Sequence, residues 1–204
     1  MTFPDFFADI APITLRDPLA ELLGAARGGL IEYRFADAVK LAGHSCPTVA
    51  GAWLMTTRGL RALYGDAVPV RGDLLAALPE AAEVGVSGVI ASVVTLLTGA
   101  TGEQGFKGLA GRHARNGLLR FGTGGSGSLR LTRCDTQAAV ECALHLERVP
   151  PDPAMGPLLY AVLDGSANAE QRERFGELWQ ERVRRLLVEH AEDPALVEVR
   201  AIHA

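Results

Sequence analysis

Residues 35–64 have the sequence FADAVKLAGHSCPTVAGAWLMTTRGLRALY, in which a His-Ser-Cys-Pro turn separates two stretches with the apolar spacing of helices. Gly43 precedes the turn, and glycine commonly ends a helix. Pro47 follows it, and proline suits the first turn of a helix because its missing N–H costs nothing there. The stretch therefore predicts two helices joined by a tight turn that carries His44 and Cys46.

Only one residue separates His44 from Cys46, so a turn can direct both side chains toward one point. A thiol near a helix N-terminus is favoured as thiolate, the form that binds metals and attacks substrates. Zinc suits this pair, but it takes four ligands, of which one is a water in a catalytic site. We therefore predict a zinc site with His44 and Cys46 as ligands, and we expect a further ligand from His113, Glu80 or a second copy of the chain.

The same two residues also fit a metal-free, cysteine-dependent enzyme. In that interpretation Cys46 is the catalytic nucleophile, His44 is its base, and the substrate is a small anionic or acyl compound. Thiol reactivity separates the two hypotheses. A metal-held Cys46 should resist alkylation until a chelator is added, whereas a catalytic thiol should react quickly at neutral pH.

Composition places the chain among ordinary globular proteins and sets limits on its partners. Its 204 residues are 48% apolar and 22% charged, which is enough to build a proper core. The formal charge of −4 gives no general basic surface, so we expect neither nucleic acid nor an acidic membrane as a partner. The three cysteines are too few for a disulfide scaffold, and we expect a reducing cytoplasm.

Two segments bear on export and on membrane insertion. The N-terminal stretch has no basic residue before Arg16, so it lacks the basic region of a secretory signal. The longest apolar run, VGVSGVIASVVTLLTG at 84–99, is shorter than the roughly 20 residues that a membrane-spanning helix needs. The run predicts a buried helix instead.

The remaining pattern predicts an α+β fold with a mixed helix-and-sheet core and a C-terminal α-rich extension. We expect the chain to comprise an N-terminal arm and helix (1–30), the α+β core (31–149) and the helical extension (150–204). Further helices are predicted over 18–27, 84–98, 136–149, 158–163 and 169–190. Strands are predicted over 73–78, 117–122, 128–133 and 196–202, with 117–122 and 128–133 paired as a hairpin across a Gly-rich turn. Apolar arm or helix surfaces predict a homodimer.

The order of these pieces resembles the formylmethanofuran dehydrogenase FmdE-like family over roughly residues 30–134. The residues that carry the resemblance are GHSCP at 43–47, Glu80 at the end of a strand, LTGAT at 97–101 and GFKGL at 105–109. The resemblance implies an accessory role in molybdenum-enzyme or one-carbon metabolism.

By position, the resemblance carries over His44, Cys46 and the loop residues Thr98, Thr101 and Lys107, with Glu80 less directly. The loop residues form a predicted cofactor-binding set, because together with free N–H groups near Cys46 they could hold a small anionic ligand.

This sequence departs from the family pattern at several ligand positions. Where the family has a further His, Cys, Asp and Cys, this chain has Ala42, approximately Gly88 and Ala91, and Ala100. A third interpretation follows from these departures, in which the chain is a degenerate scaffold that binds a partner protein.

Overall fold

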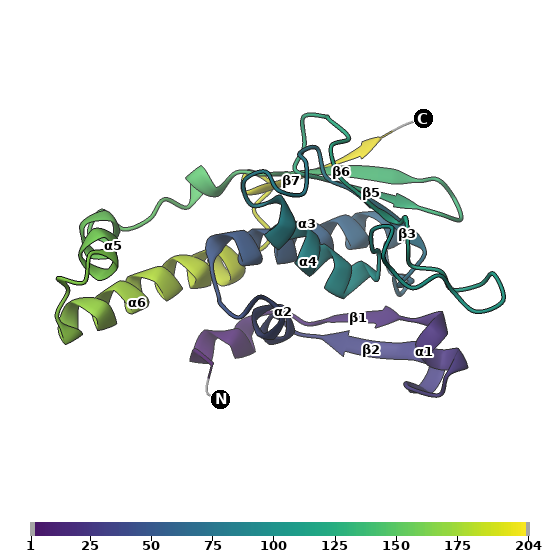
Figure 1. Cartoon of the computed structure of the whole chain (residues 1–204), viewed down its shortest axis with the longest axis horizontal. Coiled ribbons are helices and arrows are strands. Elements are labelled where there is room, and N and C mark those ends of the chain that lie inside the picture. Colours follow the sequence, from purple (N-terminus) through teal and green to yellow (C-terminus); the bar gives the residue numbers. More distant parts are fainter. Residues whose placement is uncertain (1–2, 203–204) are drawn as a thin grey trace.

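A long central helix, α3 (Pro47–Tyr64), runs through the middle of the computed structural model, which describes residues 3–202 (Figure 1). A five-stranded sheet lies on one side of α3, and a two-stranded sheet with helix α2 (Phe35–Ala42) lies on the other (Figure 1). Helix α4 (Ser87–Thr98) packs beside α3 between these layers. The fold is therefore α+β, as the sequence predicted.

Helix α3 is buried along most of its length because small residues let the sheet approach it closely. A Cβ atom at Gly59 would lie 2.9 Å from Leu131 Cδ1 and 3.1 Å from Cys142 Sγ, both on fully buried side chains of the sheet. A Cβ atom at Gly51 would collide with the side chain of Leu144. Close packing of this kind fixes where the N-terminus of α3, and with it the His-Ser-Cys turn, stands relative to the sheet.

The larger sheet has the strand order β4-β3-β5-β6-β7. Its strands are β3 (Leu74–Ala77), β4 (Leu119–Arg120), β5 (Leu129–Arg133), β6 (Ala139–Leu144) and β7 (Val197–Ile202). Neighbouring strands are antiparallel except β3 and β4, which run parallel. The smaller sheet pairs β1 (Ile13–Arg16) with β2 (Leu30–Tyr33) in antiparallel register.

The predicted hairpin between 117–122 and 128–133 is wrong. Strand β3 lies between β4 and β5, so the two segments do not pair with each other. The Gly-rich connection instead crosses the end of β3, where Gly122 N–H donates to the Glu80 carbonyl and Thr123 N–H donates to the Leu78 carbonyl. A Gly-rich turn between two segments of alternating polarity favours a local hairpin. Here the more apolar strand β3 lies between the two segments and pairs with both of them.

The predicted helix over 136–149 is also wrong, because residues 139–144 form strand β6. Gln137 adopts a left-handed backbone conformation with φ of 61°, which reverses the chain directly after β5. Strand β6 then pairs with β5 on one side and β7 on the other. Ala, Glu and Leu favour helices intrinsically, but pairing on both edges overrides that preference here.

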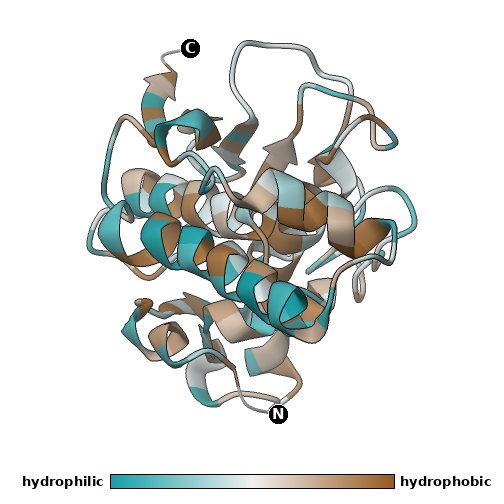
Figure 2. Cartoon of the chain, turned by 90° about the vertical axis from the view of Figure 1, so that its left-hand side faces the viewer, coloured by the Kyte–Doolittle hydropathy of each residue, from teal (hydrophilic) through white to brown (hydrophobic). Residues whose placement is uncertain are grey.

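The C-terminal region contributes two helices and an edge strand. Helix α5 (Met155–Leu163) is largely hydrophobic, whereas α6 (Ala169–Arg184) has hydrophilic residues along its outer face (Figure 2). A π-helical turn, η4 (Arg185–Glu189), continues α6, and β7 then joins the larger sheet. The helices predicted over 158–163 and 169–190 and the strand over 196–202 are confirmed.

The N-terminal arm packs on the body of the molecule. It contains a 3-10 turn, η1 (Asp5–Asp9), and the Phe7 ring meets the Phe35 ring edge-on with centroids 5.1 Å apart. Helix α1 (Pro18–Leu22) starts at the predicted cap, Asp17, but ends earlier than expected. Two more 3-10 turns, η2 (Arg27–Gly29) and η3 (Leu146–Arg148), complete the elements. Within residues 3–202, no helix combines the length and apolar character needed to cross a membrane.

Candidate functional site

The turn between α2 and α3 joins the end of one helix to the start of the next, as its sequence predicts. Helix α2 ends at Gly43, which takes a left-handed conformation with φ of 76° and donates its N–H to the Val39 carbonyl. Cys46 is the extended N-cap of α3, and Pro47 is the first helical residue. His44 and Cys46 therefore occupy the short connection between two well-defined helix ends.

The imidazole ring of His44 is exposed and is held by one hydrogen bond to the backbone. Its Nδ1 atom lies 2.9 Å from the Ala42 carbonyl oxygen. A carbonyl oxygen can only accept, so Nδ1 carries the proton and, in the neutral ring, Nε2 has the lone pair. A backbone carbonyl on one ring nitrogen is the usual support of a histidine that binds metal through the other nitrogen.

The thiol of Cys46 lies at the N-terminus of α3, where its Sγ atom accepts the Val49 N–H at 3.4 Å. The residue is 8% exposed. Helix α6 holds the turn from outside, because Trp179 Nε1 and Gln180 Nε2 both donate to the Ser45 carbonyl, at 2.9 and 3.2 Å. The turn is thus fixed by α2, α3 and α6 together.

The other predicted metal ligands lie on different parts of the fold. His113 is half-buried in the loop that follows α4 and lines a shallow depression with Arg16 and Asp73. Glu80 is exposed just after β3, and its carbonyl accepts a hydrogen bond from the Gly122 N–H. Among the described residues, no group of three or more His, Cys, Asp or Glu side chains is placed to hold a metal ion. Zinc takes four ligands, so His44 and Cys46 of one chain would not complete such a site by themselves.

The predicted cofactor-binding threonines already have hydrogen-bond partners in the backbone. Thr98 Oγ1 donates to the Val94 carbonyl and accepts the Ala100 N–H, at 2.7 and 3.1 Å. Thr101 Oγ1 donates to the Arg115 carbonyl at 2.8 Å. These bonds shape the end of α4 and the loop after it. Lys107, in the same loop, is exposed.

A buried ionic cluster, formed by Asp17, Arg71 and Arg115, was not anticipated from the sequence. Asp17 Oδ2 lies 2.7 Å from Arg71 Nη1, and its Oδ1 lies 2.6 Å from Arg115 Nη2. Burial raises the pKa of the Asp17 carboxyl, but the hydrogen bond from Arg71 and the charge of Arg115 outweigh burial, so the pKa lies below its usual value. The Asp17-Pro18 pair signalled the helix cap, whereas the two arginines are 54 and 98 residues away in sequence.

The two other cysteines differ from Cys46 in their surroundings. Cys142 is fully buried under α3, and burial raises the pKa of its thiol to about 12. Burial also raises the pKa of Cys134. Both thiols are therefore held in the protonated form, which neither binds metal nor attacks electrophiles at neutral pH.

Comparison with known proteins finds similarity in structure but no match in sequence. No family model matches it, and no curated protein matches it. Among solved structures, it is similar to a tungsten formylmethanofuran dehydrogenase FmdE-like protein from Syntrophus aciditrophicus, with a TM-score of 0.44 and 20% sequence identity. The similarity covers 84% of this chain and 73% of that chain, and it does not place this chain in a family.

Proposed function

We propose that this protein binds zinc through His44 Nε2 and Cys46 Sγ, and that a second copy of the chain supplies the same two ligands. The observation that carries the proposal is the hydrogen bond between His44 Nδ1 and the Ala42 carbonyl, beside a cysteine that caps α3. This bond supports the proposal because it fixes the exposed ring through Nδ1 and leaves Nε2 available as the ligand. The thiol two residues later is the second donor.

Zinc is the metal that suits these two donors best. Thiolate sulfur and imidazole nitrogen are its usual protein ligands, and it accepts a tetrahedral set of four. The Val49 N–H that Cys46 accepts would remain as a hydrogen bond to the bound thiolate. Such outer bonds orient a ligand and tune its basicity.

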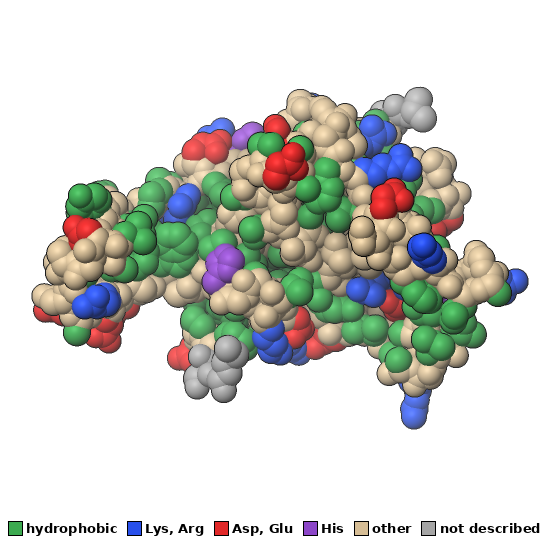
Figure 3. Space-filling model, in the orientation of Figure 1, with side chains coloured by type: hydrophobic (Ala, Val, Ile, Leu, Met, Phe, Trp, Pro, Cys, Tyr) green, Lys and Arg blue, Asp and Glu red, His purple; other side chains and the backbone are tan. Residues whose placement is uncertain are grey.

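A second copy accounts for the two missing donors. In a twofold-symmetric dimer the same surface of each protomer meets the other, so one His-Cys pair faces its equivalent and a Cys2His2 set results. Apolar surface is available close by: Leu41, in the last turn of α2, is 52% exposed. Hydrophobic side chains also gather over the end of the molecule formed by α5 and α6 (Figure 3). Helix α6 is the one that contacts the turn through Trp179.

Zinc content and mass, measured on protein purified without a metal-affinity tag, test the proposal. We expect one zinc ion per two chains and a dimer that dissociates when a chelator removes the metal. The variants His44→Gln and Cys46→Ser should lose zinc and remain monomeric. The matched control Cys134→Ser, which changes a thiol elsewhere, should keep both zinc and dimer. A full zinc ion on a monomer would contradict the second-copy arrangement, and metal-free wild-type protein would contradict the zinc site.

The second candidate function is a metal-free enzyme with Cys46 as nucleophile. The position of Sγ at the N-terminus of α3, with a hydrogen bond from the Val49 N–H, favours it. Alkylation by iodoacetamide with and without chelator separates the two. If zinc holds Cys46, the chelator should speed its alkylation several-fold. If Cys46 is a free nucleophile, the rate should be fast and unaffected by the chelator.

A further inference from the structure

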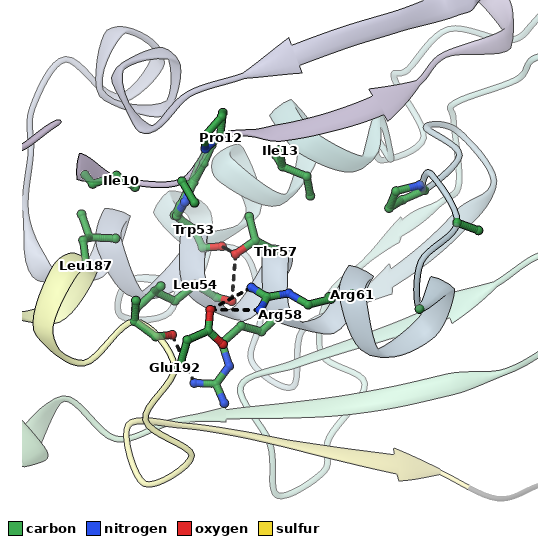
Figure 4. Close-up of a pocket in the computed structure, with 15 residues that line it drawn as sticks. Ile10, Pro12, Ile13, Trp53, Leu54, Thr57, Arg58, Arg61, Leu187 and Glu192 are labelled. Atoms are coloured by element: carbon green, nitrogen blue, oxygen red, sulfur yellow. Dashed lines mark hydrogen bonds and ion pairs between the residues drawn. The ribbon is translucent and has the colours of Figure 1, made fainter. Parts of the chain in front are cut away.

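A cavity of about 190 Å³ lies between the N-terminal arm, α3 and the segment after α6, and no residue of the His44 turn (43–47) lines it (Figure 4). One part of its wall is apolar. The apolar side chains are those of Ile10, Pro12, Ile13, Trp53, Leu54 and Leu187. Three segments that are distant in sequence thus meet around one hollow.

The other part of the wall is cationic. Arg61 Nη1 and Nη2 both lie 3.0 Å from Glu192 Oε1, and both side chains are exposed at this end of the cavity. Arg58 Nη1 donates to the Asp193 carbonyl at 2.9 Å. Arg58 Nη1 also donates to the Ala191 carbonyl at 3.4 Å, and none of the ion pairs within residues 3–202 includes Arg58. Two guanidinium groups and one carboxylate leave a net positive charge beside the apolar wall.

From this arrangement we infer that the cavity binds a small apolar carboxylic acid, with one aromatic ring or a short branched chain. An apolar cavity of about 150 Å³ is known to accept benzene, so the volume here suits a body of that size. The ring or chain packs against Trp53 and Leu54. The carboxylate lies between Arg58 and Arg61, where charged and bidentate hydrogen bonds are strong.

Glu192 is the internal competitor of such a ligand. It occupies Arg61 with an exposed ion pair, and pairs of this kind contribute little to stability. A ligand carboxylate can therefore take its place on Arg61 at small cost. Two substitutions should therefore change ligand affinity in opposite directions. Removing the charge of Arg61 should weaken binding, whereas neutralising Glu192 should strengthen it.

Calorimetric titration with benzoate, and with benzyl alcohol as its neutral counterpart, tests the inference. We expect benzoate to bind with a dissociation constant on the order of 1 mM or below, and benzyl alcohol to bind roughly tenfold more weakly. Arg61→Gln should weaken benzoate binding roughly tenfold. Glu192→Gln should strengthen it about two- to fivefold. Ala67→Trp, at an exposed position on the cavity wall, should abolish binding by filling the space.

The exposed pair of Arg174 with Glu177 on α6 provides matched controls. Arg174→Gln and Glu177→Gln make the same changes away from the cavity and should leave benzoate binding unchanged. Far-ultraviolet circular dichroism checks that every variant is folded. Absence of benzoate binding to the folded wild type, or binding that Arg61→Gln and Glu192→Gln leave unaltered, would overturn the inference. His44→Gln should bind benzoate normally, so this test is independent of the zinc site.

Discussion

At the residue scale, Asp17 has the most demanding role in the fold. Its Oδ1 accepts the N–H groups of Leu19 and Ala20 at the start of α1, and the same carboxylate pairs with Arg71 and Arg115. We predict that Asp17→Asn lowers the free energy of unfolding by about 3–5 kcal/mol, because it leaves two buried or half-buried guanidinium groups without a counter-charge. Urea denaturation measures the loss.

Asp37 provides the control for that measurement. Its carboxylate, in the first turn of α2, accepts the N–H of the N-cap residue Arg34 at 3.0 Å, but its ionic partner Lys40 is exposed. Asp37→Asn keeps an oxygen that can accept the Arg34 N–H and removes only the charge that pairs with exposed Lys40, so it should cost about 1 kcal/mol or less. Equal effects of the two substitutions would mean that the buried ion pairs of Asp17 contribute no more to stability than the exposed pair of Asp37.

The lowered pKa of Asp17 also predicts how its contribution depends on pH. A carboxyl with a depressed folded-state pKa stabilises the protein above its unfolded-state pKa, here 3.8, and loses that contribution as pH falls through the folded-state value. The stability difference between wild type and Asp17→Asn should therefore be constant from neutral pH down to about pH 5 and shrink below pH 3.8. Urea midpoints at stepped pH measure this. A difference that closes between pH 7 and pH 5 would contradict it.

The sequence predicted the capping role of Asp17 but not its ion pairs with Arg71 and Arg115. The Asp17-Pro18 pair predicted the helix cap, because the preference for Asp and Pro at a helix start is a short-range effect. The pairing with Arg71 and Arg115 depends on where distant loops lie after folding, and no short-range rule predicts it. For His44 the turn was predicted, but its hydrogen bond to the Ala42 carbonyl, only two residues away, was not, because it depends on the rotamer that the side chain adopts.

At the element scale, the close packing of α3 on the sheet gives an opposite pair of predictions for two glycines. Gly59→Ala should gain helix propensity but lose more by forcing a methyl group against Leu131 and Cys142, for a net loss of about 1 kcal/mol or more. Gly176→Ala, in α6, meets nothing within 4 Å and should stabilise by up to about 1 kcal/mol. Thermal unfolding of both variants measures the signs. A stabilising Gly59→Ala would mean that the sheet yields easily at this point.

Helices were more predictable than strand pairing for a physical reason. Each signal for α2 and α3 acts within the helix it belongs to. Gly43 ends α2, Pro47 begins α3, and an apolar stripe follows α3 as far as Gly65, so both helices formed as expected. Strand β6 has helix-forming residues and is a strand because β5 and β7 pair with its two edges. Since β7 is more than fifty residues away, the information that decides β6 is not local.

At the scale of the whole molecule, the C-terminal region completes the core. Its side chains at Leu186, Leu187, Leu196 and Val197 are at most 2% exposed, and β7 pairs with β6 along six residues. The sequence suggested an extension over 150–204, with its helices and final strand. It did not show that this strand belongs to the same sheet as β3. That depends on the path of the chain through α5 and α6, which brings β7 back to the edge of β6.

A truncation tests how far the body of the chain depends on this region. Residues 1–149 expressed alone would leave the outer edge of β6 unpaired and uncover the face of α3 that contacts η4 and β7. We expect this fragment to lack a cooperative thermal transition and to aggregate, because an unpaired strand edge beside exposed apolar surface is prone to association. Co-expression with residues 150–204 should restore solubility and the transition. A fragment that unfolds cooperatively by itself would instead establish residues 1–149 as an independent domain and residues 150–204 as an accessory layer.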